Sequence, residues 1–124
     1  MTTEPVVVWS EIPVSDMKKA VAFYNAVFDW QMTIDESGPN PMANLGSATD
    51  TVAGHLYPGT PATAGNGPTV HIAVRDRLED AAIRCRTAGG KVLGEIITIP
   101  PGRFVYATDP DGNSIGLFEP AKAA

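Results

Sequence analysis

The sequence predicts an α+β fold in which two similar βαβββ modules form an open, curved mixed sheet, a partial barrel, around a cavity. Two observations lead to this prediction. Similar strand segments recur at an offset of 60 residues, and each half of the chain places one helix-like segment between strand-like segments. The cavity is expected because a helix covers only one face of each sheet and leaves the other face free.

Size and composition restrict the possible functions. A chain of 124 residues with 44% hydrophobic and 19% charged residues is expected to fold as one domain, over residues 1–124. Its net charge of −5 is spread without a run of Lys or Arg, so neither nucleic acid nor a membrane surface is expected as a partner. The single cysteine, Cys85, cannot close an intrachain disulfide, and the first residues lack the pattern of a signal peptide. We therefore expect a cytoplasmic protein.

The first module is expected over about residues 5–58. The segment "SEIPVSD" reads as its first strand, and the helix-like segment "DMKKAVAFYNAVF" follows, with Ser15 or Asp16 able to cap its first amides. Three further strands are expected in "WQMTIDE", "MANLGSA" and "TVAGHLY". This order is one complete βαβββ unit.

A linker at 59–67, rich in Pro, Gly, Thr and Ala and without apolar periodicity, separates the first module from the second, which covers about residues 68–120. Its opening segment "VHIAVRD" aligns with "SEIPVSD" at an offset of 60. The following "DRLEDAAIRCRTAGG" is expected to be a helix that ends at Gly89 and Gly90. The last three strands are expected in "KVLGEIITI", "RFVYAT" and "NSIGLFE".

Strand alternation sorts the candidate site residues by face. In the first strand Trp9 and Glu11 are expected on the cavity side, and His71 takes the place of Glu11 in the second module. We aligned the ends of the two halves at an offset of 62, which pairs Gly54 with Gly116. That offset predicts that Leu56 faces the cavity and that His55 faces the helix.

These positions give a predicted site with aromatic walls. Arg103, which follows the "PPG" turn, is expected to meet an anionic ligand at the cavity mouth. The predicted ligand-binding residues are Trp9, Gly54, Leu56, Arg103, Tyr106, Gly116 and Phe118. Glu11 and His71 are the predicted catalytic pair, because a carboxylate and an imidazole that face one apolar cavity can exchange a proton.

Three segments together resemble a known family: "EIPVSDMKKAVAFYNAVFDW", "AVRDRLEDAAIRCRTAGGKV" and "GRFVYATDPDGNSIGLFE". They look like the vicinal oxygen chelate superfamily, which contains glyoxalase I, bleomycin and fosfomycin resistance proteins and extradiol dioxygenases. The most specific part is "DPDGN" before the last apolar strand. The resemblance implies paired βαβββ modules around a ligand site and a homodimer.

Metal-dependent members of that superfamily bind a divalent ion with four His or Glu side chains, from the first and last strands of each module. In this sequence those positions fall on Trp9, Gly54, one of residues 69–71, and Gly116. Glycine has no side-chain ligand, and the indole nitrogen carries a proton. The resemblance therefore points to a glyoxalase-like subgroup that lacks the usual ligands, and we predict no cofactor and no metal-ligating residue.

Three functions stay open from the sequence. The favoured one is a protein that binds a small organic molecule without a metal, and the net acidity favours a cationic or neutral guest. The second is a metal-independent isomerase or lyase that uses Glu11 and His71. The third is a metal-dependent lyase or dioxygenase whose divalent ion lies at a displaced site near Glu11, His55 and His71.

Overall fold

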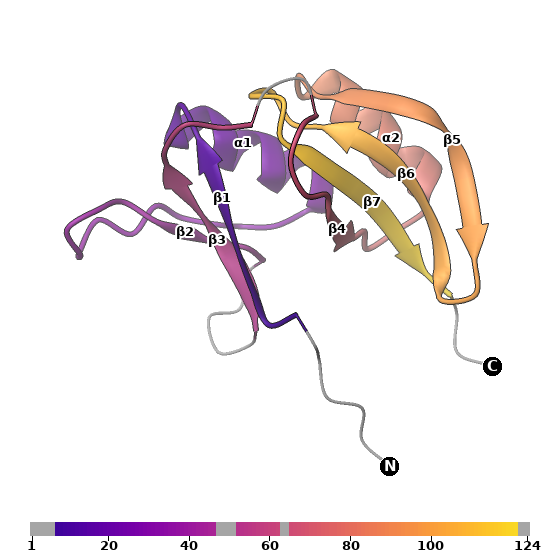
Figure 1. The fold of residues 1–124 in the computed structure, drawn as a ribbon, viewed down its shortest axis with the longest axis horizontal. Helices are drawn as coiled ribbons and strands as arrows, with labels where there is room; N and C mark the ends of the chain where they lie inside the picture. Colours follow the sequence, from indigo (N-terminus) through magenta and orange to yellow (C-terminus); the bar gives the residue numbers. More distant parts are fainter. Residues whose placement is uncertain (1–6, 47–51, 63–64, 122–124) are drawn as a thin grey trace, which may run out of the picture.

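The computed structural model describes residues 7–46, 52–62 and 65–121, and shows two open sheets side by side with one helix behind each (Figure 1). The N-terminal sheet has the strand order β1-β3-β2, and its helix is α1. Its elements are β1 (Trp9–Val14), α1 (Met17–Phe28), β2 (Ala43–Asn44) and β3 (Ala53–Pro58).

The C-terminal sheet has the strand order β4-β7-β6-β5, and α2 lies against it. Its elements are β4 (Val70–Ala73), α2 (Leu78–Thr87), β5 (Lys91–Ile99), β6 (Gly102–Thr108) and β7 (Ser114–Pro120). The predicted α+β fold with open sheets is therefore confirmed. No helix within the described ranges is long and apolar enough to cross a membrane.

The first module is less regular than the second. The segment "WQMTIDE", expected to be a strand, forms only an isolated bridge between Asp35 and Met42. The segment "MANLGSA" contributes only the short β2, and its last two residues lie outside the described residues. In the second module all four expected strands form. The expected module and linker boundaries stay predictions.

Strand register shows how the two halves correspond. In the parallel pair β1–β3, Glu11 lies opposite His55; in the parallel pair β4–β7, His71 lies opposite Gly116. Since Glu11 and His71 are repeat equivalents at an offset of 60, His55 is the equivalent of Gly116. The ends of the halves therefore correspond at an offset of 61, and the predicted offset of 62 is wrong.

The two helices begin in different ways. Asp16 caps α1, since its carboxylate accepts a hydrogen bond from the Lys19 amide over 3.1 Å. Arg77, at the corresponding position of α2, makes no side-chain cap bond. Glu119 of β7 provides the cap instead, because its Oε1 accepts the Leu78 amide over 2.8 Å. The start of α2 is thus fixed to the last strand of its own sheet.

The "DPDGN" turn joins the two modules. Its first residue, Asp109, is 3% exposed and accepts a hydrogen bond from the Tyr24 hydroxyl of α1 over 2.8 Å. Asn113 Nδ2 donates to the Pro13 carbonyl of β1 over 2.8 Å, and Asp111 accepts bonds from the Ser15 amide and hydroxyl. The segment that carries the strongest family resemblance therefore fastens the second module to the β1–α1 junction.

Candidate ligand-binding site

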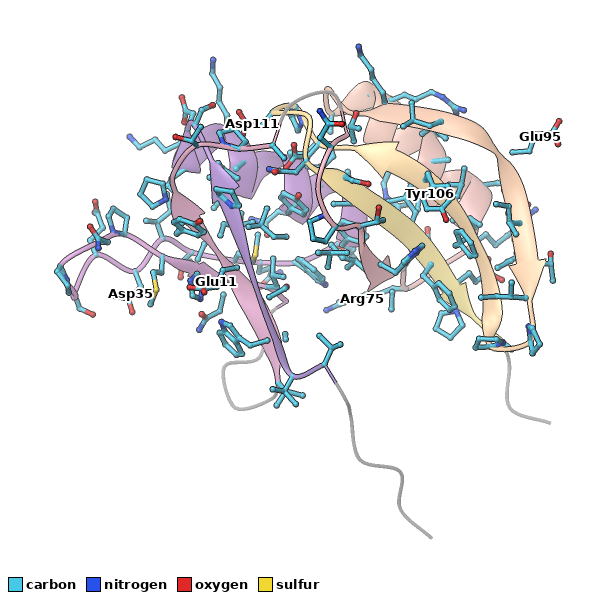
Figure 2. All side chains as sticks on the ribbon, viewed as in Figure 1. Glu11, Asp35, Arg75, Glu95, Tyr106 and Asp111 are labelled. Carbon is cyan, nitrogen blue, oxygen red and sulfur yellow. The ribbon has the colours of Figure 1, made fainter. Side chains whose placement is uncertain are left out.

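A cavity of about 640 Å³ lies where the N-terminal sheet meets β4. Most of its lining is apolar, and the polar groups come from Ser10, His71 and Arg75. The described lining residues are Ser10, Trp30, Leu45, Gly46, Val52, Ala53, Val70, His71, Ile72, Ala73 and Arg75. We call this space the seam cavity. Figure 2 shows Glu11 on the N-terminal sheet, Tyr106 on the C-terminal sheet and Arg75 between them.

A second cavity, of about 460 Å³, lies along the same seam beneath the linker. It is lined by β1, including Glu11, by the linker residues Thr60, Pro61, Ala62 and Asn66, by Pro68 and Val70, and by the start of β7. Ser10 and Val70 line both cavities. The predicted pair Glu11 and His71 is therefore divided between the two, with His71 on the seam cavity and Glu11 on the second.

His71 lies directly over Gly116. A Cβ atom placed on Gly116 would stand 2.0 Å from Nδ1 of His71, so the imidazole occupies the space that a side chain there would need. Although His71 is partly open to solvent, desolvation lowers its pKa from the ordinary value, which favours the neutral ring at physiological pH. The imidazole of His71 therefore fills the space beside Gly116, the position at which the family's fourth metal ligand would stand.

Three aromatic rings surround the other sides of His71. Its ring centroid lies 4.8 Å from that of Phe104, 5.8 Å from that of Tyr106 and 5.9 Å from that of Phe118. Tyr106, Gly116 and Phe118 therefore share one sheet face with His71, as predicted. Tyr106 is 40% exposed, and neither seam-side cavity includes Tyr106 or Phe118 in its lining. These rings form an open aromatic face beside the seam cavity.

Trp9, His55 and Glu11 form a hydrogen-bonded chain on the N-terminal sheet. The indole Nε1 of Trp9 donates to Nδ1 of His55 over 3.0 Å, and Nε2 of His55 lies 3.2 Å from Oε1 of Glu11. An indole nitrogen can only donate, so Nδ1 of His55 must be the acceptor and its proton must lie on Nε2. Both imidazole nitrogens are therefore engaged within the protein.

The predicted faces of β3 are wrong by one residue. Leu56 lies opposite Ile12, is fully buried in the core, and does not face a cavity. His55, expected beneath the helix, shares the face of Glu11 instead. Gly54 lies opposite Ser10, where a Cβ would stand 2.3 Å from the Ser10 carbonyl oxygen, so this glycine permits close approach of β1 and β3. A slip of one residue exchanges the two faces of a strand.

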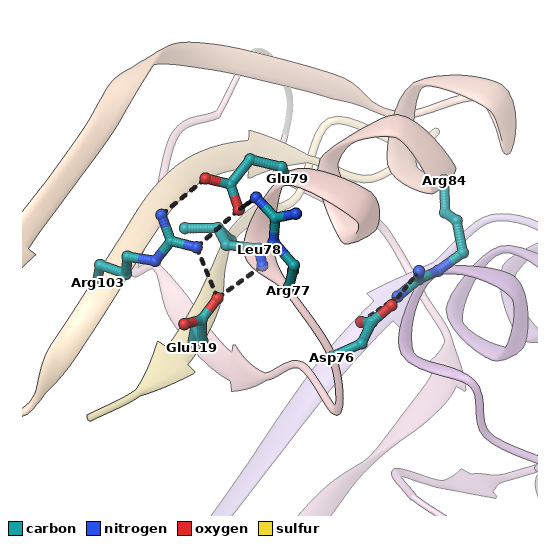
Figure 3. Close-up of polar contacts among 7 residues, drawn as sticks. All are labelled: Asp76, Arg77, Leu78, Glu79, Arg84, Arg103 and Glu119. Carbon is teal, nitrogen blue, oxygen red and sulfur yellow. Dashed lines mark hydrogen bonds and ion pairs between the residues drawn. The ribbon is translucent and has the colours of Figure 1, made fainter. Parts of the chain in front are cut away.

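Arg103 lines neither of the two cavities described above. It alternates with Phe104 on β6 and bonds across the helix-covered face, with Nη1 and Nη2 donating to Glu79 of α2 over 2.8 and 2.6 Å (Figure 3). Nη2 also donates to Glu119 over 2.9 Å. Hydrogen bonds from Arg103 hold the pKa of Glu79 at about 2 and lower that of Glu119. Arg103 thus attaches α2 to the sheet, and its expected ligand-binding role stays a prediction.

A second arginine, Arg84, ties the two modules together. Arg84 of α2 donates from Nη1 and Nη2 to Asp76 over 2.7 and 2.8 Å (Figure 3). Its Nε and Nη2 also donate to the Val27 carbonyl near the end of α1. The Arg84 guanidinium lowers the pKa of Asp76. The carboxylate of Asp76 is therefore already paired with Arg84. The neighbouring Arg75 has no ion pair or side-chain hydrogen bond within the described part of the chain.

The residues at the positions of the family's metal ligands do not fit a metal ion. Gly116 has no donor atom, and the imidazole of His71 fills the space beside it. His55 uses both nitrogens, one of them to accept from Trp9. Over the described ranges no three His, Cys, Asp or Glu side chains gather as a metal set. Glu11 and His71 share no hydrogen bond or ion pair there, and their predicted catalytic role stays a prediction.

Sequence reasoning missed Arg75 and placed His55, a candidate of the displaced metal site, on the wrong face of β3. Matching Leu56 with Leu117, both fully buried, would have placed His55 on the outer face. Arg75 continues the alternation of His71 and Ala73 beyond β4, which is a weak signal because the strand has already ended.

Comparisons with known proteins agree with this fold. The family model named Glyoxalase/Bleomycin resistance protein/Dioxygenase superfamily matches residues 6–117. Among curated proteins, CFP32 of Mycobacterium bovis, named as a candidate glyoxylase, is 31% identical over 116 residues, which are 92% of this chain and 44% of that protein. The chain thus spans less than half the length of this relative. A glyoxylase-like domain-containing protein of Didymella fabae is 28% identical over 115 residues, covering 85% of this chain and 88% of that one.

Solved structures at lower identity share the fold. A glyoxalase/bleomycin resistance protein from Albidiferax ferrireducens superposes with a TM-score of 0.69 at 18% identity, covering 94% of this chain and 100% of the other. TnmS3, an antibiotic binding protein from Streptomyces sp. CB03234, superposes with a TM-score of 0.63 at 24% identity, covering 98% of this chain and 100% of the other. With the two βαβββ-like halves and the family match over most of its length, the chain belongs to the glyoxalase/bleomycin resistance protein/dioxygenase superfamily.

Proposed function

We propose that this protein binds a small organic molecule in the seam cavity without the help of a metal ion. The observation that carries the proposal is the cavity itself, about 640 Å³ in volume and lined mainly by apolar side chains with a few polar groups. This size and composition are typical of small-molecule sites. The site differs from the sequence-based expectation, because its walls come from the seam rather than from Leu56, Tyr106 and Phe118.

A binding role is favoured over acid–base catalysis by the partners of Glu11. Its carboxylate faces Nε2 of His55, and it lines the second cavity rather than the cavity of His71. An acid and a base that act as a pair must both reach one bound substrate, each within hydrogen-bond distance, or one water, of the proton that it moves. Catalysis by Glu11 and His71 remains the second candidate, because the neutral imidazole of His71 lines the seam cavity and can accept a proton.

The relatives give this proposal general support. The fold neighbour TnmS3 is named as an antibiotic binding protein, so this fold can serve to hold an organic guest. The homodimer expected from the family resemblance is part of the proposal, and light scattering on the purified chain measures it. Exposed apolar side chains on β5, among them Leu93 and Ile97, are 44% and 42% exposed and would gain from such contact.

The test uses a neutral apolar dye, phenylnaphthylamine, whose emission rises in apolar surroundings. A Trp9→Phe variant leaves Trp30 as the sole tryptophan. Because Trp30 lines the cavity, it should transfer excitation energy to the bound dye. Ala73→Phe places a ring in the cavity from an exposed position and should weaken binding about tenfold or more through steric exclusion. Ala22→Phe, on the exposed face of α1, is the matched control and should bind as the parent does.

Two results would overturn the proposal. One is the absence of any dye binding with Trp30 energy transfer in the folded protein. The other is equal binding by the Ala73→Phe and Ala22→Phe variants, which would place the dye elsewhere on the surface.

A further inference from the structure

We propose that the ligand of the seam cavity is an organic anion, an apolar body that carries one oxyanion such as a carboxylate, and that Arg75 binds this oxyanion. The inference rests on the proposed function and specifies its ligand class. It departs from the expectation drawn from net charge alone, which favoured a cationic or neutral guest.

The first argument is that Arg75 is uncompensated. Arg75 is an exposed residue that lines the cavity, and in the described ranges no carboxylate forms an ion pair with it. The adjacent carboxylate, Asp76, is held by two hydrogen bonds from Arg84. Asp29 borders a small neighbouring cavity together with Arg75, Asp76 and Arg84, yet makes no ion pair with Arg75. The guanidinium is thus left with its donors available.

The second argument is the charge inside the cavity. Among its described lining residues, Arg75 is the only one with a formal charge at neutral pH, because burial lowers the pKa of His71 and keeps it neutral. No described lining residue carries a carboxylate. The net charge of −5 acts over longer distances and is largely screened by salt, whereas a direct guanidinium contact is screened less. The local chemistry therefore selects an anion.

The third argument is the division of the cavity into two kinds of wall. Trp30, Leu45 and Val52 offer apolar surface, and Arg75 and His71 offer hydrogen-bonding groups. A guanidinium is planar and presents parallel N–H donors that match the two oxygens of a carboxylate. A ligand with an apolar body and one terminal oxyanion satisfies both walls at once.

The experiment compares two dyes that share the same rings. Anilinonaphthalene sulfonate carries an oxyanion, and phenylnaphthylamine is its neutral counterpart. Both are titrated into the full chain, into an Arg75→Met variant and into an Arg86→Met variant. Methionine keeps an unbranched apolar stem while removing the charge, and Arg86 is an exposed arginine of α2 that does not line the cavity.

We expect Arg75→Met to weaken binding of the anionic dye about tenfold, as expected for loss of a charge-assisted contact, and to leave the neutral dye nearly unchanged. Arg86→Met should affect neither dye. Added salt should weaken the anionic dye in the parent protein more than in Arg75→Met, because the screened interaction is then already missing.

Failure of this inference is distinct from failure of the proposed function. If the neutral dye binds in the cavity but Arg75→Met leaves anionic binding unchanged, the cavity is real and Arg75 does not select the ligand. Equal weakening of both dyes by Arg75→Met also overturns the inference, because the side chain then acts by packing. If neither dye responds to Ala73→Phe, the proposed function itself is overturned.

Discussion

The imidazole of His71 occupies the place of the side chain that Gly116 lacks. The two residues lie opposite each other in the parallel pair β4–β7, and a Cβ on Gly116 would come within 2.0 Å of Nδ1 and 2.5 Å of Cε1. The glycine that removes a potential metal ligand therefore also fixes the orientation of the histidine beside the aromatic face. Loss of the ligand and placement of the imidazole have one structural cause.

Gly116→Ala should displace His71 from this position. The new methyl group cannot coexist with the ring, and repacking a tight contact costs about 1–3 kcal/mol of unfolding free energy. The displaced imidazole is less buried, so its pKa should rise toward the ordinary value of 6.5. Urea unfolding measures the first effect and an NMR titration of His71 the second.

Gly38→Ala is the matched control, because a Cβ there has no atom within 4 Å. It should change the unfolding free energy by less than about 0.5 kcal/mol. In the parent protein the lowered pKa of His71 means that the unfolded chain binds the proton more readily. The stability linked to this group is therefore fully present above pH 6.5 and is lost as the pH falls below 6.5 and through the lower pKa of the folded protein. An unchanged His71 titration in Gly116→Ala would contradict this account.

Regular periodicity made most of the fold predictable from sequence. The helices and all four strands of the second module follow apolar patterns that are decided locally, by alternation and by turn residues such as Gly112. The segment "WQMTIDE" alternates in the same way, yet only Asp35 finds a bridge partner. Pairing there depends on a neighbouring strand that the local sequence does not specify.

The candidate site was predictable only in part, because sites depend on register. The faces of Trp9, Glu11, His71 and Phe118 follow from alternation within one strand. The face of His55 depends on which residue lies opposite it, and aligning glycine with glycine shifted β3 by one position. Arg103 was misplaced for a different reason: its partner Glu79 is distant in sequence, and only the folded structure brings them together.

The ion pairs of Arg103 predict a decline of the unfolding free energy at acid pH. The pKa of Glu79 lies at about 2 in the folded protein against an ordinary 4.5, so the pair contributes stability that is present above pH 4.5 and lost as the pH falls toward 2. Glu79→Gln should flatten the decline of the unfolding free energy between these two pH values. Urea titrations at stepped pH measure it.

Glu95→Gln provides the comparison for Glu79→Gln. Glu95 is exposed on β5 and forms no ion pair within the described residues. The unfolding free energy of Glu95→Gln should therefore decline at acid pH as that of the parent does. Because Glu79 is well exposed to solvent, the difference should shrink in high salt. If the unfolding free energies of the parent and Glu79→Gln decline identically at acid pH, the Arg103–Glu79 pair contributes no pH dependence.

The contact between Tyr24 and Asp109 predicts a larger cost than surface pairs. Tyr24→Phe removes the hydroxyl that donates to a carboxylate with 3% exposure and should lower the unfolding free energy by about 1–3 kcal/mol. Tyr57→Phe is the control, since its ring packs on His55 at a half-buried position. Denaturant unfolding compares the two, and equal effects would assign the loss to general packing.

Cys85 should be inert while the protein is folded. Burial raises the pKa of its thiol to about 11 from an ordinary value of 9.0, so its thiolate fraction at neutral pH is about a hundredfold below that of a free cysteine. Alkylation by iodoacetamide, followed by mass spectrometry, should be slow in buffer and fast in urea. Labelling at equal rates in both would mean that α2 opens readily.

The chain from Trp9 through His55 to Glu11 predicts a single histidine tautomer. Because the indole can only donate, His55 should carry its proton on Nε2 at neutral pH, which the nitrogen chemical shifts of the imidazole report. Trp9→Phe removes the donor and should allow both tautomers. A Tyr57→Phe variant, which leaves the indole in place, should keep the Nε2–H form.

The contacts of His55 with Trp9 and Glu11 also predict weak metal binding. A metal ion would need Nδ1 or Nε2 of His55, and each is already bonded, so zinc or nickel should bind the parent protein weakly and Trp9→Phe no more than modestly better. Elemental analysis of protein purified without chelators measures this directly. Near-stoichiometric zinc, nickel, manganese or iron would contradict this expectation and would restore a displaced metal site, with Glu11, His55 and His71 as its candidates.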